Sequence, residues 1–485
     1  MKKAIKTRFA PSPTGYLHIG SLRTALYNYL FAKQNKGKFI LRIEDTDQER
    51  YVESSEKKLI QALQKIGLKW NGGPSIDKSL NIKEKGQNKP YFQSKRLEIY
   101  KKHAQKLIKS GGAYYCFCSK ERLEKLRQEQ QAKKQPPKYD GLCRNLTEAE
   151  IKQRINDKKP YVIRLKVPEK GIVKFNDLIR GDISINVSEI DDQVLIKSDG
   201  FPTYHLAVVI DDHLMGITHI IRGEEWLPST PKHILLYQAF GWEIPIFAHL
   251  PLLLNPDKSK LSKRQGDVSV EDFLDKGYLP EALINYVALL GWHPQDDREA
   301  FSLNGLIKKF DLTRVQKSGA IFDIEKLNWF NSHYIKQKSD KELFKLCLKH
   351  CPDLDPKILE KILKNEKERL GTIAQIADLV KSTVEIAEYS ENFLIFKRSD
   401  KETTVKGLKI SLEKLSGLKK WNREAIKSNL EKAVSENQLT NGDVFWPVRV
   451  ALSGLEKSPP PEEIMEIIGK DESLDRIKKA IEKLG

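Results

Sequence analysis

The chain has 485 residues, of which 31% are charged, and its formal net charge is +18. This length exceeds that of one compact domain and predicts three or four structural units. The positive charge favours a polyanionic partner, with a lysine-rich surface that serves solubility alone as the alternative. Five cysteines in so long a chain argue against a disulfide framework and for a reducing compartment.

Membrane insertion and secretion are not expected. Met1, Lys2 and Lys3 lead directly into a predicted strand, with no apolar run before a cleavage site. No stretch approaches the roughly 18 consecutive apolar residues of a membrane-spanning helix. The sequence therefore predicts a cytoplasmic protein without a membrane partner.

The chain begins with a strand–helix–strand pattern. Lys3–Arg8 and Phe39–Ile43 are predicted strands, and apolar residues recur at helical spacing after Ser21 between them. This order is typical of the start of a nucleotide-binding α/β fold. Glu44 and the acidic residues after it follow the second strand, at the carboxyl edge where open parallel sheets bind ligands.

The next segments alternate between helices and a polar insertion. Lys57–Ile66 and Arg96–Ile108 are predicted helices, and the lysine-rich stretch Ile76–Lys89 between them is predicted to be a loop.

Residues 113–194 differ in character from both neighbouring regions. A charged helix, a breaker and alternating strand runs follow one another there, and the nucleotide-binding sheet is expected to resume near Val194. The elements are the helix Lys120–Gln131, the breaker Lys133–Lys138, and the strand runs Pro160–Val167 and Val173–Val187.

The rest of the chain is predicted to be helical, first from about Phe273 to Phe322 and then to the C-terminus. Because no run of alternating strands follows Phe322, an all-α C-terminal half is expected. The helices predicted there are Lys341–His350, Pro356–Lys364, Thr372–Tyr389, Thr403–Leu415, Arg423–Ser435 and Ser473–Leu484.

Two short motifs carry chemistry. His18, Gly20 and Ser21 stand where the apolar run enters the first helix, and a helix N-terminus offers unpaired N–H groups to phosphates. Gly20 lets the backbone approach a nucleotide without a Cβ in the way. Far along the chain, Lys260 and Lys263 flank a serine in a cationic stretch suited to a departing pyrophosphate.

These motifs, HIGS and KLSKR, resemble the HIGH and KMSKS motifs of class I aminoacyl-tRNA synthetases. Residues 8–15 (RFAPSPTG) and 42–47 (RIEDTD) are similar to the glutamyl-tRNA synthetase versions, and the helical tail to the bacterial type. The resemblance covers the whole chain, most densely residues 5–330. Further matches are Asp199–His205, Asp211–His213, Ile221–Trp226, Ser229–Pro231 and Asn255–Lys258.

The resemblance implies an α/β multidomain fold: a Rossmann-like core with an inserted α+β domain for the tRNA acceptor end and an all-α anticodon-binding half. Residues 1–112 and 195–255 would form the catalytic domain and 113–194 the insertion. Residues 256–322 would carry the KMSKS loop and a helical stem-contact domain, and 323–485 the anticodon-binding domain.

The implied function is that of a glutamate–tRNA ligase, which activates L-glutamate with ATP and transfers it to the 3′ end of tRNA(Glu). ATP brings Mg²⁺, held mainly by phosphates and water. A monomer is expected. His18, Lys260 and Lys263 would be catalytic, stabilising charge on the phosphates rather than forming a covalent bond.

The resemblance also assigns substrate contacts. Arg8 would hold the side-chain carboxylate of glutamate, Arg222 the α-carboxylate, and Glu44, supported by Ser12, the α-ammonium, with Ala10 and Tyr204 beside them. Val208 stands where some relatives have a substrate-contacting Asn. The predicted ATP site consists of His18, Gly20, Ser21, Glu225, Trp226, Leu253, Lys260, Leu261, Ser262, Lys263 and Arg264.

Two further assignments follow from the resemblance. Cys116, Cys118 and Cys143 match three ligands of a Zn²⁺ site in some bacterial relatives, but Asn145 stands at the fourth, histidine position. Tyr139 or water would have to complete such a site. Arg369 aligns with an arginine that reads an anticodon base, with a solvated helix arginine as the alternative.

Other functions remain in view. A glutaminyl enzyme is disfavoured by Arg8 in its APSPTG context, RIEDTD and the helical tail. The truncated paralogue that glutamylates a modified tRNA base lacks an anticodon half. A catalytically inactive tRNA-binding module would not need the intact motifs. Whether tRNA(Gln) is also charged stays open.

Overall fold

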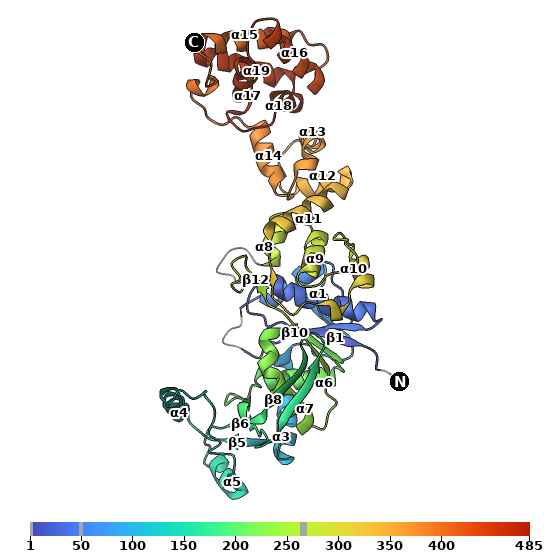
Figure 1. The fold of residues 1–485 in the computed structure, drawn as a ribbon, viewed down its shortest axis with the longest axis vertical. Coiled ribbons are helices and arrows are strands. Elements are labelled where there is room, and N and C mark those ends of the chain that lie inside the picture. The colour runs from blue at the N-terminus through green and yellow to red at the C-terminus, as the bar shows by residue number, and fades with distance from the viewer. Residues whose placement is uncertain (1–2, 48–51, 262–268) are drawn as a thin grey trace. The chain divides into compact units, whose positions relative to one another are not determined.

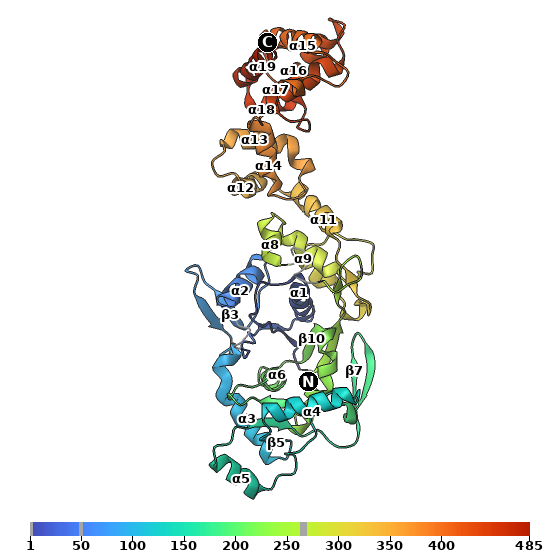
Figure 2. The same cartoon turned by 90° about the vertical axis from the view of Figure 1, so that its left-hand side faces the viewer.

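The computed structural model describes residues 3–47, 52–261 and 269–485. The chain forms two compact units (Figures 1 and 2). The first is Met1–Leu274 with Pro280–Leu327, and the second is Asp275–Leu279 with Asn328–Gly485. The predicted site residues Ser262, Lys263 and Arg264 lie outside the described residues.

The first unit is organised by parallel strands. β1 (Lys6–Phe9) and β2 (Lys38–Leu41) pair in parallel and are connected by α1 (Ile19–Gln34). β10 (His219–Gly223) and β11 (Ile246–Leu250) also pair in parallel. The N–H of Thr218 donates to the carbonyl of Lys6 at 2.9 Å, which ties the start of β10 to β1. The predicted nucleotide-binding α/β core is therefore present.

Helix α1 is the central helix of this unit. Leu22, Leu26 and Leu30 are fully buried, as expected of a helix that is apolar on most of its circumference. The Tyr27 hydroxyl donates to the carbonyls of Ala288 and Leu290, both at 3.0 Å, and so joins α1 to α9 (Pro280–Leu289), which is seen beside it in Figure 2.

The insertion contains a small antiparallel sheet and a hairpin. β5 (Ala113–Cys116), β6 (Val162–Leu165) and β9 (Val194–Ile196) form the sheet in the order β5-β6-β9. The single predicted run Val173–Val187 is two strands, β7 (Ile172–Asp177) and β8 (Gly181–Asn186).

The prediction that the nucleotide-binding sheet resumes near Val194 is wrong. Val194 is opposite Arg164 in the antiparallel sheet of the insertion. After α6 (Tyr204–Leu214), β10 pairs in parallel with β11, and β11 also pairs in parallel with β7 of the hairpin, where Phe247 is opposite Asp177. These strands form one sheet in the order β10-β11-β7-β8, to which β9 does not belong.

The polar stretch Ile76–Lys89 is not simply a loop. β3 (Gly73–Ile76) and β4 (Ile82–Lys85) form an antiparallel hairpin. The Asp77 carboxylate closes its turn by accepting from the N–H groups of Ser79 and Asn81, both at 2.9 Å. Sequence reasoning missed the hairpin because β3 (GPSI) contains a glycine and a proline, and β4 (IKEK) has a single apolar residue.

Most predicted helices of the first unit are confirmed: α2 (Ser55–Lys65), α3 (Leu97–Lys109) and α4 (Lys120–Ala132). Helix α5 (Glu148–Asn156) was not predicted, because it is only 9 residues long and has only two large apolar side chains, Ile151 and Ile155. A reciprocal cap between Thr147 and Glu150 starts it. The remaining elements are α7 (Thr230–Ala239), α8 (Val270–Asp275), α10 (Leu303–Lys309), β12 (Leu253–Leu254) and β13 (Ala320–Ile321).

The second unit is helical, as predicted, and no strand occurs in its described residues. Helices α15 to α19 gather around one apolar core that includes Leu408, Leu430 and Ile477 (Figure 1). The helices are α11 (Ile324–Gln337), which begins in the first unit, α12 (Asp340–Leu348), α13 (Pro356–Glu366), α14 (Gln375–Val384), α15 (Lys401–Ser416), α16 (Arg423–Ser435), α17 (Asn441–Ser453), α18 (Pro461–Ile468) and α19 (Lys470–Leu484).

Nothing in the described part of the chain could serve as a transmembrane helix, since none of its helices combines the length and the apolar character required.

Candidate active site

A cavity of about 380 Å³ opens beside the carboxyl ends of β1 and β10, where parallel sheets place ligands. It brings together residues that are more than 200 positions apart in the sequence. Every described residue predicted to contact glutamate or ATP lines it: Arg8, Ala10, Ser12, His18, Gly20, Ser21, Glu44, Tyr204, Arg222, Glu225, Trp226, Leu253, Lys260 and Leu261.

His18 is the N-cap of α1. Its Nδ1 accepts a hydrogen bond from the N–H of Gly20 at 3.0 Å, so the neutral ring carries its proton on Nε2. A Cβ added to Gly20 would lie 3.3 Å from this Nδ1 and 3.8 Å from Leu253 Cδ1. The glycine therefore keeps the entrance of the helix open.

The described start of the KLSKR motif also borders the cavity. The N–H of Leu261 donates to the carbonyl of Leu253 at 2.9 Å, and this bond anchors the segment on β12. Leu261 is buried while Lys260 is exposed, so the ammonium group faces solvent beside the cavity.

A chain of buried ion pairs joins Arg8 to Glu44. Arg8 Nε lies 3.2 Å from both carboxylate oxygens of Asp212. The same carboxylate accepts from Arg42 Nη1 at 2.7 Å, and Arg42 Nη2 donates to Glu44 at 2.9 Å. All four side chains are less than a tenth exposed. Asp212 thus fixes Arg8 through Nε and leaves its two Nη groups without a hydrogen-bond partner among the described residues.

Burial and the arginines act in opposite directions on these carboxylates. Burial raises the pKa of Asp212, but the combined effect of Arg8 and Arg42, which lower it, is larger. The pKa of Asp212 therefore lies below its ordinary value. For Glu44 burial outweighs the effect of Arg42, and its pKa is raised.

Sequence reasoning assigned no role to Arg42, Asp211 or Asp212. Asp211 accepts from Arg96 Nε at 2.8 Å and from the Tyr100 hydroxyl at 2.8 Å, so it anchors α6 to α3. A signal was present, because two adjacent acidic residues within an apolar helix must be buried and paired.

Arg222 is held on all sides by protein acceptors. Its five N–H groups are directed at the atoms that follow. These are His249 Nε2 at 3.1 Å, the Tyr204 hydroxyl at 3.1 Å, His233 Nδ1 at 3.2 Å, the Trp226 carbonyl at 3.4 Å and Thr230 Oγ1 at 2.9 Å. The guanidinium group is therefore rigid. Because the Tyr204 hydroxyl accepts from Arg222, its own proton is available for another acceptor.

Trp226 and Glu225 shape the adjoining wall of the cavity. The Trp226 ring lies over Tyr204 with the ring centroids 4.2 Å apart. A Cβ at Gly223 would meet the Glu225 carboxylate where it now lies, so a larger residue there would require this carboxylate to move aside.

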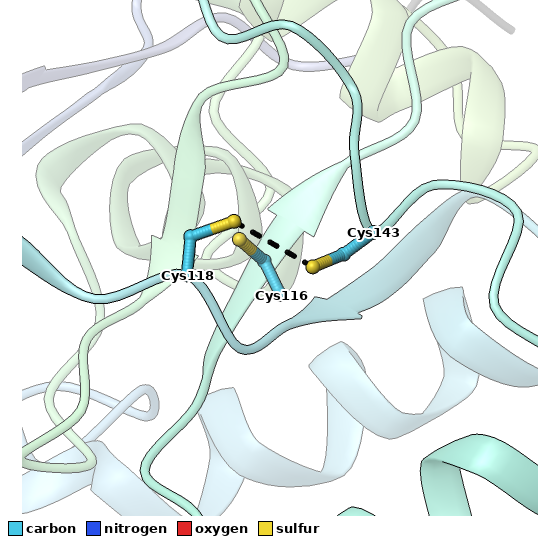
Figure 3. Close-up of side chains that lie close together, drawn as sticks. All are labelled: Cys116, Cys118 and Cys143. Atoms are coloured by element: carbon cyan, nitrogen blue, oxygen red, sulfur yellow. Dashed lines mark hydrogen bonds between the residues drawn. The ribbon is translucent and has the colours of Figure 1, made fainter. Parts of the chain in front are cut away.

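The three predicted thiols form a cluster (Figure 3), and none of them lines the cavity. The sulfur atoms of Cys116, Cys118 and Cys143 lie within 4.8 Å of one another. The Tyr139 hydroxyl is 3.4 Å from two of them, Cys116 and Cys118. Hydrogen bonds from Cys143 and then Tyr139 lower the pKa of Cys116. Asn145, by contrast, is exposed.

In the second unit, Arg369 follows α13 with its side chain 59% exposed. One of its Nη atoms lies 3.1 Å from Glu366 and 3.7 Å from Glu463.

Both units match known protein families. Residues 4–329 match the family "tRNA synthetases class I (E and Q), catalytic domain", and residues 342–481 match the family "Anticodon binding domain". The chain is 46% identical to a glutamate--tRNA ligase of Clostridioides difficile, with 98% of each chain covered. It is 45% identical to one of Alkaliphilus metalliredigens, with 99% of this chain and all of the relative covered.

Solved structures agree with these matches. A glutamate tRNA ligase from Elizabethkingia meningosepticum, in complex with its amino acid, superimposes with a TM-score of 0.86 at 40% identity, and both chains are fully covered. The enzyme from Elizabethkingia anophelis gives a TM-score of 0.84, also at 40% identity, over 99% of this chain and all of that one. The chain therefore belongs to the class I tRNA synthetases and, among them, to the bacterial glutamate–tRNA ligases.

Proposed function

We propose that the cavity activates L-glutamate with ATP and that the glutamyl group then passes to the 3′ end of tRNA(Glu). One observation carries this proposal. Arg8, a cation whose two Nη groups can still donate, and Glu44, an anion, both line the cavity. They lie beside the N-terminus of α1, where His18 is the N-cap. Glutamate requires cationic and anionic contacts, and ATP requires such an entrance.

In the first step an oxygen of the glutamate α-carboxylate attacks the α-phosphorus of ATP. The bond from that phosphorus to the bridging oxygen breaks, and pyrophosphate leaves. His18 Nε2–H would donate to a phosphate oxygen as charge builds up, and Lys260 with Lys263 would neutralise pyrophosphate. In the second step a ribose hydroxyl of the terminal tRNA nucleotide attacks the glutamyl carbonyl, and AMP leaves.

The substrate contacts follow from charge. The two Nη groups of Arg8 would hold the glutamate side-chain carboxylate in a bidentate contact, which a neutral glutamine satisfies poorly. Glu44, held by Arg42, would accept from the α-ammonium together with Ser12. The Tyr204 hydroxyl, which accepts from Arg222, would donate its own proton to the α-carboxylate, and the positive charge of Arg222 would attract the carboxylate from behind Tyr204.

The nucleotide contacts and the domain roles are proposed on the same basis. Gly20, Ser21, Glu225, Trp226 and Leu253 would surround the nucleoside and phosphates, with Mg²⁺ on the phosphates and water. Residues 113–194 would hold the acceptor end, and 323–485 would bind the anticodon, with Arg369 at a base. We propose a cytoplasmic monomer.

The thiol cluster would hold structural Zn²⁺. Tetrahedral thiolates at the usual zinc distance have sulfur atoms about 3.8 Å apart, and the Sγ atoms of Cys118 and Cys143 are 3.6 Å apart. The Tyr139 hydroxyl, 3.4 Å from the sulfur atoms of Cys116 and Cys118, or a water molecule would supply the fourth ligand that Asn145 does not offer. Elemental analysis of the protein should find one zinc per chain, and Cys118→Ser with Cys143→Ser should remove it. Purified protein without zinc would contradict the assignment.

The proposed function is tested by ATP–pyrophosphate exchange with glutamate, with and without tRNA(Glu). We expect exchange that depends on glutamate and requires tRNA, and little exchange with glutamine. Robust exchange with glutamine, or none with any amino acid, would exclude the proposal.

A further inference from the structure

Two buried histidines hold Arg222 from different elements. His249 lies on β11 and accepts from Arg222 Nε at 3.1 Å, and His233 lies on α7 and accepts from Nη1 at 3.2 Å. The two side chains are 0% and 1% exposed. Because an arginine always carries its protons, each histidine must present a lone pair to it.

In each histidine, the ring nitrogen that does not face Arg222 has its own hydrogen-bond partner, and this partner fixes which nitrogen carries the proton. His249 Nδ1 lies 2.6 Å from an Asp177 oxygen and donates to it, which leaves Nε2 as the acceptor. His233 Nε2 lies 3.0 Å from His205 Nδ1 and donates to it, which leaves Nδ1 as the acceptor. The two histidines therefore meet the arginine with opposite ring nitrogens.

Burial, together with the positive charge of Arg222, favours the neutral form of both rings. His249 faces Asp177 on β7, Arg180 in the turn after β7, and Arg222 on β10. His233 faces Arg222 and, on α6, His205. Burial, followed by Arg222, lowers the pKa of His233. Burial also lowers the pKa of His249, and Arg222 adds to this while Asp177 opposes it.

We infer that His233 and His249 are positioning residues that fix the orientation of Arg222 and thereby set the affinity for the amino-acid substrate. The inference rests on the proposed function, in which Arg222 and Tyr204 face the α-carboxylate. Loss of either acceptor leaves a buried N–H without a partner and frees the guanidinium group to rotate. A small rotation would displace the Tyr204 hydroxyl that Arg222 holds.

Substitution by asparagine or by glutamine tests which of the two ring nitrogens must be an acceptor. The amide oxygen of asparagine can occupy the place of Nδ1, and that of glutamine the place of Nε2. His249→Gln and His233→Asn therefore keep the acceptor for Arg222, whereas His249→Asn and His233→Gln lose it. The KM values for glutamate and ATP are measured in exchange assays at saturating tRNA(Glu), together with the thermal midpoint of each variant.

We expect the KM for glutamate to rise about tenfold in His249→Asn and His233→Gln. It should stay near the wild-type value in His249→Gln and His233→Asn, and the KM for ATP should be unchanged in all four. His219 is the control, because it lies on β10, the strand that carries Arg222. Its Asn and Gln variants should both leave the KM for glutamate unchanged.

The inference is overturned if the same substitution is tolerated at both positions. It is also overturned if the KM values for glutamate and ATP rise together, or if the KM for glutamate follows the thermal midpoint. In each of these cases wild-type exchange with glutamate leaves the proposed function intact. A wild-type protein without such exchange would remove both.

Discussion

At the scale of single residues, Arg8 shows how a side chain can be anchored and still be available. Asp212 uses only Nε, and the two Nη groups remain for a ligand. Arg8→Lys keeps the positive charge but loses the planar fork. We expect the KM for glutamate to rise ~10- to 100-fold, since a charged hydrogen bond contributes about 1.5–3 kcal/mol.

This is checked by exchange kinetics in which glutamate and ATP are varied separately. Arg127→Lys, at a side chain that is 68% exposed, is the matched control and should not change either KM. An equal rise in the KM for ATP would contradict a contact confined to glutamate.

His205 gives a prediction for pH. Burial, with Lys232 and Arg222, lowers its pKa from 6.5 to about 4. The unfolded chain therefore binds more protons between these two pH values. The contribution of His205 to stability is fully present above pH 6.5 and is lost as the pH falls towards 4, at most about 3 kcal/mol.

The thermal midpoint of wild type is compared with that of His205→Asn at pH 7.5 and 4.5. Asparagine keeps an acceptor for His233 but does not titrate, so wild type should lose stability relative to the variant at the lower pH. His293→Asn, at an exposed histidine, should show a much smaller change between the two pH values. A constant difference between wild type and His205→Asn would refute the prediction.

At the scale of elements, the crossing of α15 and α17 depends on one missing Cβ. A Cβ at Gly407 would collide with the carbonyl of Asp443 on α17. Gly407→Ala should therefore destabilise the second unit by about 1–3 kcal/mol. Gly417, at the end of α15, has its nearest contact at 3.8 Å, and Gly417→Ala should be nearly neutral.

Urea unfolding of the two variants tests this packing, with exchange kinetics as a second measurement. Because the cavity is lined entirely by the first unit, folded Gly407→Ala protein should keep the wild-type KM for glutamate. Equal destabilisation by both substitutions would show that the close crossing is not the cause.

The elements differ in how far the sequence predicts them. Helices with an apolar stripe, such as α2 and α16, were predicted nearly to their ends, whereas α5, with 9 residues and only two large apolar side chains, was missed. The partner of β9 could not be predicted, because strand pairing depends on where distant segments fold.

The cavity residues could be predicted because short motifs carry them. Their supports could not: Asp177 and His249, for example, come from strands 72 positions apart and meet only through tertiary structure. The roles assigned to the cavity residues remain predictions for the experiments above.

At the scale of the whole molecule, glutamate activation and tRNA recognition are expected to respond to different variables. The net charge of +18 predicts that tRNA binding releases counterions, so the KM for tRNA should rise steeply with salt. The KM for ATP, measured at saturating tRNA, should respond far less. Arg369→Ala should raise the KM for tRNA(Glu) about tenfold, within the roughly 1–3 kcal/mol of a base contact, and leave the KM for glutamate unchanged.

Aminoacylation at a series of salt concentrations measures these values. Arg398→Ala, at another exposed arginine of the second unit, serves as the comparison: loss of a phosphate contact alone would weaken all tRNAs equally. Arg369→Ala, in contrast, should change the ratio of the kcat/KM values for tRNA(Glu) and tRNA(Gln). If Arg369 recognises an anticodon base that only one of these tRNAs carries, its loss weakens the reaction with that tRNA alone. An unchanged ratio would exclude a contact of Arg369 with an anticodon base at which the two tRNAs differ, and would favour a solvated arginine paired with Glu366.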